Sequence, residues 1–371
     1  MAKKKLSKEE SIQKTKNFTE LVICACILAV GGFFIGKAVK NTETVKVSEY
    51  YDKQQVTEAT TAAPEAEDPD RIIFENTSVN TKDKFRGDLI LVNEDHKYYS
   101  TGDEDLVSVT EKNNENGIDY FSGVDEEAHG AMTVRSVVYE NMKNMITDFY
   151  NNTGLTDLII YGGYRSTEFQ QELYDADLAE TGAEDSTRVA KPGYSEHESG
   201  YAFDFTLADT YDYDGTGEYA WFTENCWKYG FVLRYPEGKE EITKIQYEPW
   251  HFRYVGVVHA KYMTENDLTL EEYTDLLRTK YIYGSDRLKY SDDKTNYEIY
   301  FVASDDSADT TAVPVPSGCE YTISGNNIDG FVVTADVGTP ETSFTDDTAS
   351  TDDTVAEDDT ASEDTQAVEE S

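Results

Sequence analysis

The sequence predicts an α+β fold in which a small sheet is flanked by helices. The segment YAFDFT (Tyr201–Thr206) alternates aromatic with small or polar residues, which is the two-residue period of a half-buried strand. Apolar residues recur at helical spacing from Met132 to Tyr150, and DLIIYGGYRS (Asp157–Ser166) contains an apolar strand that ends in paired glycines. Strands and helices therefore share one folded region, which we place at residues 71–280.

Within this region the predicted elements follow in order along the chain. GDLILVN (Gly87–Asn93) is predicted to be a strand, and the helix at 132–150 follows it. The strand in Asp157–Ser166 leads into a second helix, from about Thr167 to Glu180, and YAFDFT forms the next strand. The order strand, loop, helix recurs, and the loops between these elements are where we look for functional side chains.

The N-terminal part of the chain has the pattern of a membrane anchor followed by a stalk. Residues 1–20 are basic, and residues 21–39 form an apolar run that is uncharged for most of its length. About 20 apolar residues span a bilayer, and a basic flank stays in the cytoplasm. We expect a cytoplasmic segment at 1–20, a transmembrane helix at 21–39, a stalk at 40–70 and an extracellular remainder. A cleaved signal peptide is the alternative, because residues 36–38 include the small residues of a cleavage pattern.

The C-terminal part predicts a small β extension and then a disordered acidic tail. Asn296–Asp305 and Cys319–Asp336 read as two to four short strands, which we place in an extension at 281–338 that packs against the folded region. The last residues of the chain are almost only Asp, Glu, Thr, Ser and Ala. Such a segment buries too little apolar surface to offset its ordering entropy, so we expect residues 339–371 to be disordered.

The charge of the chain restricts its partners. A formal net charge of -42 argues against binding of nucleic acid, which depends on Lys and Arg that neutralise phosphates. An anionic substrate would need a local cation. The cysteines decide less: Cys226 and Cys319 could form one disulfide or remain two free thiols, and the chain contains no CxxC spacing for a cysteine zinc site.

Two short stretches, SEHESGYAFD and YEPWHF, bring together residue types that suit a catalytic zinc. Such a zinc takes three protein ligands from His and carboxylates, and a nearby carboxylate accepts a proton from water. We predict His197, Asp204 and His251 as the ligands and Glu248 as the base. Strand parity turns Asp204 away from its aromatic neighbours. Glu248 and His251 have opposite parity in a regular strand, so a bend at Pro249 must direct both into one cavity.

The remaining histidines lack such a context. His96 lies in a polar turn, His129 follows two glutamates, and His259 comes after a strand, so all three are interpreted as structural or surface residues. The acidic loop at Thr210–Trp221 resembles a calcium-binding loop in its middle. Its first and twelfth positions are Thr210 and Trp221 rather than acids, so we interpret it as a turn.

The motifs resemble those of a known family. SEHESGYAFD fits SxHxxGxAxD, EPWH fits the closing metal motif, and GYRS with Gln170 fits the substrate motif of the VanY-type zinc D-alanyl-D-alanine carboxypeptidases. This family belongs to the LAS group, which shares its fold with hedgehog signalling domains. The resemblance covers about Gly87 to Leu277 and implies a small antiparallel sheet with flanking helices that carry a zinc cleft. It also implies one zinc ion (Zn2+) per chain.

The resemblance assigns further roles to residues near the predicted metal site. His197, Asp204 and His251 would bind zinc, and Glu248 would take a proton from the zinc-bound water that attacks the peptide bond. Arg165 is the candidate to hold the substrate carboxylate or the developing oxyanion, with a structural ion pair as the alternative. Three softer candidates for substrate contact each have a structural alternative: Gln170 as part of a helix capping box, Ser195 as a loop cap, and Trp250 as a core residue.

The activity implied is removal of the terminal D-alanine from peptidoglycan stem peptides, outside the membrane of a Gram-positive-type bacterium. A D,D-carboxypeptidase is favoured, with an L,D-carboxypeptidase or an endopeptidase on the same fold as the alternative. A non-catalytic, zinc-containing wall-binding protein is a second alternative, and a surface interaction protein built on the β extension and acidic tail is a third. The sequence does not indicate the oligomeric state.

Overall fold

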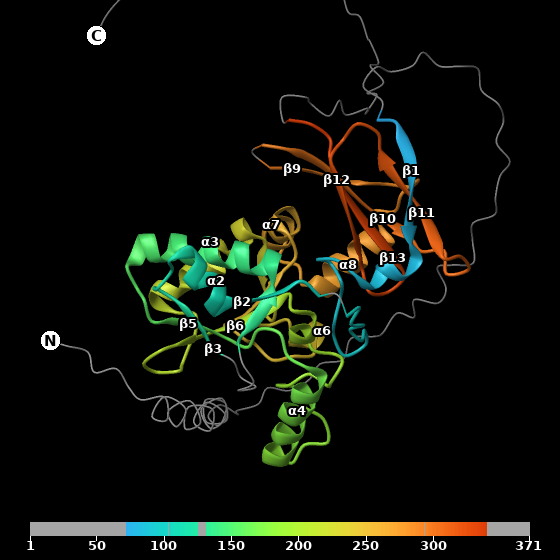
Figure 1. Ribbon diagram of the computed structural model, residues 1–371. Coiled ribbons are helices and arrows are strands. Elements are labelled where there is room, and N and C mark those ends of the chain that lie inside the picture. The colour runs from blue at the N-terminus through green and yellow to red at the C-terminus, as the bar shows by residue number, and fades with distance from the viewer. Residues whose placement is uncertain (1–71, 103, 125–130, 293, 340–371) are drawn as a thin grey trace, which may run out of the picture.

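The computed structural model describes residues 72–102, 104–124, 131–292 and 294–339 (Figure 1). The described chain forms a main body, from β2 to α8, and a β extension made of β1 and β9 to β13. The predicted cytoplasmic segment, anchor and stalk at 1–70 and nearly all of the predicted tail lie outside the described residues. Among the helices that the structure describes, none is long and apolar enough to cross a membrane.

A five-stranded sheet with the order β3-β5-β6-β8-β7 lies at the centre of the main body. Its neighbouring strands run antiparallel except for the edge strand β3, which pairs with β5 in parallel, so the sheet is mixed rather than purely antiparallel as expected. The strands are β3 (Ser122–Val124), β5 (Leu158–Tyr161), β6 (Ala202–Leu207), β7 (Phe231–Leu233) and β8 (His251–Tyr254).

The helix α3 (Ser136–Thr153) packs against one face of this sheet. Its apolar side chains, among them Met142 and Phe149, form one core with Phe203 and Phe205 of β6 and Phe252 of β8. Alternation along β6 and β8 therefore directs the aromatic side chains toward α3 and leaves Asp204 and His251 on the opposite face. The expected helix began at 132, but residues 133–135 pair with β2 as a short strand, and the helix begins at Ser136.

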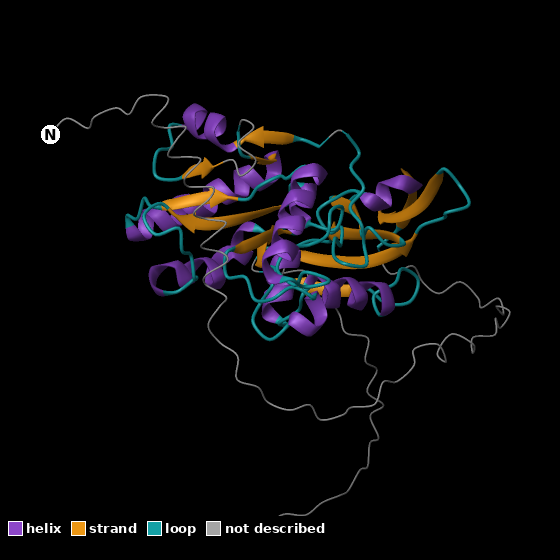
Figure 2. Ribbon diagram, turned by 90° about the horizontal axis from the view of Figure 1, so that it is seen from below, coloured by secondary structure: helices purple, strands orange, loops and turns teal. Residues whose placement is uncertain are grey.

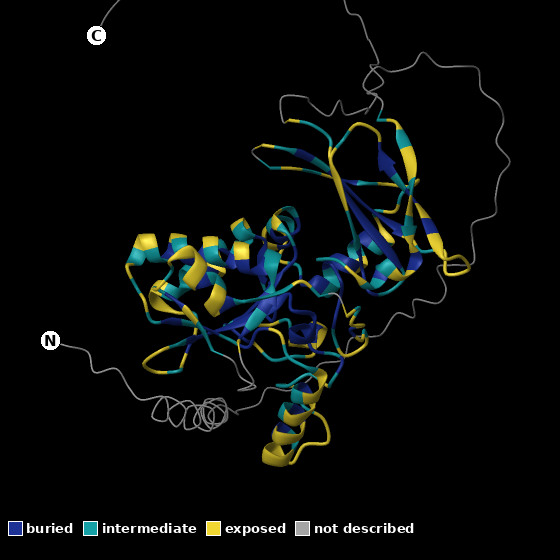
Figure 3. Ribbon diagram, in the orientation of Figure 1, coloured by how far each residue is buried: buried dark blue, intermediate teal, exposed yellow. Residues whose placement is uncertain are grey.

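Apart from α4 and α8, the other elements of the main body are short. Figure 1 shows that α4 (Thr167–Thr181) projects away from the main body, and Figure 3 shows that its far end is exposed. The remaining elements are β2 (Leu106–Ser108), α2 (Val109–Asn116), β4 (Thr133–Arg135), η3 (Glu196–Ser199), η4 (Gly217–Tyr219), α5 (Ala220–Asn225), η5 (Cys226–Tyr229), α6 (Glu240–Thr243), α7 (Val257–Glu265) and α8 (Leu270–Thr279).

The segment Gly87–Asn93, expected to be a strand, does not join a sheet. Its backbone groups bond instead to a loop and to side chains: the Leu91 amide donates to Asn326 O, and the Arg253 guanidinium donates to Asp88 O and Ile90 O. Its apolar side chains alternate between two cores, with Leu89 and Leu91 in one and Ile90 and Val92 in the other. The apolar run from Leu89 to Val92 therefore belongs to a chain that runs between two cores, not to a strand of a sheet.

The β extension contains two small antiparallel sheets, which lie to one side of the main body (Figures 1 and 2). One sheet has the order β12-β13-β10-β9, and the other pairs β11 with β1, a strand from before the main body in sequence. The strands are β1 (Phe74–Asn80), β9 (Leu288–Ser291), β10 (Asn296–Ala303), β11 (Thr310–Pro316), β12 (Tyr321–Gly325) and β13 (Gly330–Asp336), and the turn η2 (Thr81–Phe85) follows β1.

The extension and the main body share a core. Ile299 of β10 and Val332 of β13 pack in one cluster with Leu270 and Tyr273 of α8. His259 of α7 lies in the same contact region, where its ring nitrogens face Tyr273 Oη at 2.8 Å and Thr334 Oγ1 at 3.0 Å. The extension is therefore a packed part of the fold, as the sequence predicts.

Candidate active site

One turn of 3-10 helix positions His197 above β6. The turn η3 ends at Gly200, which adopts a left-handed φ of 71°, and a Cβ there would lie 2.9 Å from Leu106 Cδ2. Glycine at this position allows the chain to reverse closely into β6. His197 Nδ1 lies 2.9 Å from Gly163 O in the loop between β5 and α4, and the amide of Arg165 donates to His197 O. These contacts fix the ring at the end of β5.

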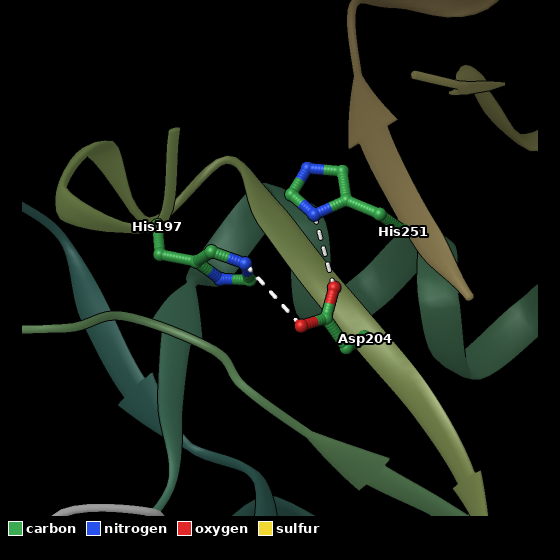
Figure 4. Close-up of side chains that lie close together, drawn as sticks. All are labelled: His197, Asp204 and His251. Atoms are coloured by element: carbon green, nitrogen blue, oxygen red, sulfur yellow. Dashed lines mark ion pairs between the residues drawn. The ribbon is translucent and has the colours of Figure 1, made fainter. Parts of the chain in front are cut away.

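Asp204 and His251 face each other across two neighbouring strands. They are direct partners in the antiparallel register of β6 and β8, which places their side chains side by side on the face opposite α3. His251 Nδ1 lies 3.0 Å from Asp204 Oδ1, and His197 Nε2 lies 3.4 Å from Asp204 Oδ2 (Figure 4). The carboxylate of Asp204 thus stands between two imidazoles.

Glu248 reaches the same place from the turn that precedes β8. The amide of His251 donates to Glu248 O across Pro249 and Trp250, so the chain bends before the strand begins. The bend brings Glu248 Oε2 to 3.8 Å from His251 Nδ1, and both side chains are buried. This is the arrangement that the bend at Pro249 predicts.

The donor atoms of His197, Asp204 and His251 fit a metal ion. One ligand atom from each lies within 4.8 Å of the other two. Each histidine nitrogen lies close to a different oxygen of Asp204, at 3.0 and 3.4 Å, and either separation is similar to the edge of about 3.3 Å of a tetrahedron with metal bonds of about 2.0–2.1 Å. Asp204 Oδ1 is buried and satisfies no hydrogen-bond criterion among the described residues, although His251 Nδ1 lies 3.0 Å from it. A cation bound here would satisfy that oxygen.

The hydrogen bonds of the two imidazoles leave the correct nitrogen facing the cluster. His197 Nδ1 faces a backbone carbonyl, which only accepts, so Nδ1 carries the hydrogen and Nε2 keeps its lone pair toward Asp204. His251 Nε2 lies 3.4 Å from Glu196 Oε2, so this nitrogen donates to a carboxylate and Nδ1 faces Asp204. In the neutral form of each ring, the acceptor nitrogen is therefore the one that faces Asp204, as a metal ligand requires.

Charge and burial shift the pKa values of the cluster. Burial alone would raise the pKa of Asp204, but His197 and His251 outweigh it and hold the pKa well below its usual range. Burial lowers the pKa of His197, and the charge of Arg165 adds to this effect. Burial would also lower the pKa of His251, but Asp204 and Glu196 raise it to about 9. Asp204 is thus an anion flanked by histidines, which is a favourable environment for a cation.

Glu248 has the opposite shift from Asp204. Burial raises the pKa of Glu248 to about 8, although the neighbouring His251 lowers it in part. A carboxyl group whose pKa lies near neutrality can both accept and return a proton at physiological pH. The structure thus combines one carboxylate that stays ionised with one that can change its protonation state.

Arg165 lies beside the cluster because the loop after β5 turns sharply. Gly162 has a φ of 63°, and a Cβ there would lie 2.7 Å from Asp204 Oδ2 and 2.9 Å from Arg165 Nη2. Arg165 Nη2 lies 3.4 Å from Asp204 Oδ2. Among the described residues, Asp204, a strand residue, lies within ion-pair distance of Arg165. The guanidinium therefore stands next to the three metal-ligand candidates.

Comparison with known proteins identifies the family. Residues 131–257 match the family VanY, D-alanyl-D-alanine carboxypeptidase. A D-alanyl-D-alanine carboxypeptidase of Enterococcus faecium is 36% identical over 281 residues, which cover 72% of this chain and 83% of the relative. The chain belongs to the VanY family. It is therefore a carboxypeptidase, like the relatives that are named D-alanyl-D-alanine carboxypeptidase.

Two further proteins are similar to this chain, one over a third of its length and one over most of it. A bifunctional D-Ala-D-Ala dipeptidase and D-Ala-D-Ala carboxypeptidase, VanXYC of Enterococcus gallinarum, is 44% identical over 134 residues, covering 34% of this chain and 70% of the relative. The solved structure of the vancomycin resistance D,D-dipeptidase VanXYg, in complex with a D-Ala-D-Ala phosphinate analogue, has 31% identity and a TM-score of 0.60. That match covers 71% of this chain and 99% of the other.

The softer substrate candidates differ in how the structure places them. Ser166, not Thr167, is the N-cap of α4, so Gln170 does not complete a capping box, and that alternative is wrong. Gln170 is buried, its Nε2 donates to Ala190 O, and its Oε1 has no partner among the described residues. Ser195 is also buried, and its side chain does not cap η3 within the described chain. Trp250 is half-buried and packs against the core.

Sequence analysis missed a buried ionic cluster behind His251. Glu196 Oε1 accepts from Arg234 Nε at 2.8 Å and from Arg253 Nη1 at 2.7 Å, and all three side chains are fully buried. Burial would raise the pKa of Glu196, but the two arginines outweigh it and hold the pKa well below its usual range. A signal was present: Glu196 lies inside the SEHESG motif, and Arg253 shares strand parity with His251.

The remaining candidates lie away from the cluster. His96 bonds to Asn93 in a turn, His259 is a buried structural residue, and His129 lies outside the described residues. Cys226 and Cys319 are free thiols in the described chain, which answers the question left by the sequence. In the acidic loop, Asp214 Oδ1 accepts from the amide and hydroxyl of Thr216, as an ordinary turn does.

Proposed function

We propose that this VanY-family enzyme is a zinc D,D-carboxypeptidase that removes the terminal D-alanine from peptidoglycan stem peptides. The observation that carries the proposal is the convergence of His197, Asp204 and His251, with Glu248 3.8 Å from His251, in a chain of this family. The substrate class comes from the relatives, which are named for activity on D-Ala-D-Ala.

In the proposed reaction, His197, Asp204 and His251 hold one zinc ion and Glu248 handles protons. Zinc in such a site supplies Lewis-acid chemistry, which polarises a peptide carbonyl and makes water more acidic. Glu248, as its carboxylate, accepts a proton from the attacking water and then donates it to the nitrogen of the departing D-alanine. The burial of Glu248 favours its protonated form after the first transfer, and this helps it to return the proton.

Arg165 supplies positive charge at the proposed site. In a chain with a formal net charge of -42, a substrate carboxylate needs such a partner to bind beside Asp204 and Glu248. A guanidinium offers a planar pair of donors that suits a terminal carboxylate or a developing oxyanion. The buried Gln170 Oε1, which lacks a partner among the described residues, is an acceptor suited to a peptide N–H of the substrate.

The enzyme is proposed to act outside the cell, anchored by residues 21–39. The support is the basic segment followed by an apolar run at the start of the chain. Peptidoglycan lies outside the membrane, so the proposed substrate agrees with the proposed orientation. Labelling of cysteines introduced before and after residues 21–39 in intact cells tests it, because protection of the second position would contradict an extracellular catalytic body.

A second candidate activity is hydrolysis of the free D-Ala-D-Ala dipeptide. The observation in its favour is the similarity to VanXYg, a D,D-dipeptidase, over 99% of that chain, together with the bifunctional VanXYC. Carboxypeptidase and dipeptidase activity differ in whether the site accepts a long chain on the amino side of the scissile bond. An L,D-carboxypeptidase would instead require a tetrapeptide stem.

One experiment separates these activities. The zinc-loaded full-length protein is incubated with a pentapeptide stem, a tetrapeptide stem and the D-Ala-D-Ala dipeptide, and the released D-alanine is measured. Release from the pentapeptide alone supports the D,D-carboxypeptidase, and release from the tetrapeptide alone identifies an L,D-carboxypeptidase. Glu248→Gln is the matched control, because it preserves size and removes the base. Equal turnover by this variant would contradict the proposed role of Glu248.

A further inference from the structure

A buried carboxylate stands directly behind one of the proposed zinc ligands. Glu196 is 1% exposed, and its two oxygens have different partners. Oε1 accepts from Arg234 Nε at 2.8 Å and Arg253 Nη1 at 2.7 Å, whereas Oε2 lies 3.4 Å from His251 Nε2. The side chain therefore connects an arginine pair to the rear nitrogen of His251.

The arginine pair is itself held in place. Arg234 also donates to both oxygens of Glu271 on α8, at 2.9 and 2.6 Å. Arg253 Nη2 donates to Asp88 O and Ile90 O, both at 2.9 Å. With each guanidinium bonded on its other sides, Glu196 Oε1 cannot shift without breaking several buried bonds, so Oε2 keeps its direction toward His251.

The two proposed histidine ligands are oriented in different ways. His197 Nδ1 faces the backbone carbonyl of Gly163, so a backbone group holds the hydrogen on that nitrogen. Nε2 of His251 faces the Glu196 carboxylate, which accepts a hydrogen and cannot donate one. With the hydrogen on Nε2, the lone pair of His251 lies on Nδ1, the atom that faces Asp204. The contact that orients His251 can therefore be removed by substituting Glu196, whereas the contact that orients His197 is to the backbone.

We infer that Glu196 is a positioning residue for the metal site, which holds His251 in the orientation and tautomer that present Nδ1 to zinc. This inference rests on the proposed function, since it assigns His251 as a zinc ligand. Carboxylates that accept from a metal-bound histidine fix the ring and increase its basicity, and their loss typically lowers metal affinity about 10- to 100-fold. In this role Glu196 acts through its contact with His251.

The test uses Glu196→Gln with Glu271→Gln as a matched control. Both variants remove one carboxylate from Arg234, but only Glu196 contacts His251. A glutamine has a single oxygen, so it can accept either from the arginines or from His251 and cannot reproduce both contacts. Zinc affinity of the full-length protein is measured by chelator competition, the visible spectrum is recorded with Co2+ in place of zinc, and thermal unfolding is measured without metal.

We expect Glu196→Gln to bind zinc about 10- to 100-fold more weakly and to alter the Co2+ spectrum. Glu271→Gln should lower the unfolding temperature of the metal-free protein while changing zinc affinity less than about threefold. Equal zinc affinity and equal Co2+ spectra in the two variants would overturn the inference. A wild-type chain that bound no zinc would instead overturn the proposed function, and the inference with it.

A third variant keeps the test decisive if the glutamine variant fails to fold. Glu196→Asp retains the charge that Arg234 and Arg253 require but shortens the side chain by one methylene, which withdraws Oε2 from His251. We expect a folded protein with weakened zinc binding. A folded Glu196→Asp variant with wild-type affinity and spectrum would show that the contact with His251 has no role in metal binding.

Discussion

Glu248→Gln should stabilise the metal-free protein while abolishing its activity. In the folded chain, burial raises the pKa of Glu248 from its ordinary value of 4.5 to about 8. In the unfolded chain this carboxyl ionises near its ordinary value. Between these pH values the native state binds more protons than the unfolded state, so the stability of the wild type falls as pH rises. Glutamine has the same shape and no ionisable proton, so it escapes this loss.

The magnitude follows from the two pKa values. Each pKa unit corresponds to about 1.4 kcal/mol, so the full shift is worth on the order of 5 kcal/mol at a pH above 8. At pH 7, where the native carboxyl is still mostly protonated, the same linkage gives about 3 kcal/mol. The variant should therefore exceed the wild type by about 3 kcal/mol at pH 7, and the two should converge as pH falls below 4.5.

The assay is urea unfolding of both proteins without metal, followed by tryptophan fluorescence at several pH values from 4 to 9. Groups distant from Glu248 contribute nearly equally to both proteins, so the difference between them reports on Glu248 together with His251, whose charge is coupled to it. A difference that stays constant with pH, or a variant less stable than the wild type at pH 8, would refute the reasoning. With zinc bound the gain should shrink, because a nearby cation favours the charged carboxylate of the wild type.

Three further predictions concern the site and the β extension. Arg165→Ala should lower kcat/KM for a pentapeptide stem roughly 100-fold, because the guanidinium beside Asp204 is lost, and an unchanged value would rule out its role. Gly162→Ala should weaken zinc binding, since the added Cβ would lie 2.7 Å from Asp204 Oδ2, whereas Gly154→Ala, with a similar φ and open space, should not. Ile299→Ala should reduce the free energy of unfolding by about 2–5 kcal/mol, because Ile299 packs in the core that the extension shares with the main body. The fluorescence of the tryptophans in the main body should report a single cooperative transition. Two separate transitions would show that the extension unfolds independently.

The sequence located the candidate site through residue type and strand parity. Parity of YAFDFT turns Asp204 away from Phe203 and Phe205, and the structure places those rings in the core with α3. Pro249 indicates a bend that lets Glu248 and His251 share a cavity, and the two side chains lie 3.8 Å apart. These predictions succeed because they depend on local geometry, which a few neighbouring residues determine.

Predictions that required distant partners were less successful. Gly87–Asn93 has the apolar run of a buried strand, but its backbone bonds to Asn326 and Arg253 rather than to a neighbouring strand. β1 lies before the main body in sequence and pairs with β11 after it, so no local pattern could assign it to the extension. Gln170 fits a capping box by spacing, yet the helix begins one residue earlier, at a different cap.

The sequence by itself indicated which residues to propose as metal ligands, which carboxyl to propose as the base, and that the chain resembles a zinc carboxypeptidase. These properties reside in side-chain chemistry and short spacings. Only the tertiary structure decided how the site is supported. Glu196, Arg234 and Arg253 come from separate segments, and their contact behind His251 exists because the sheet register and the packing of Gly87–Asn93 bring them together. Buried charges are stable only when folding supplies their partners, and partners distant in sequence become visible only in the folded chain.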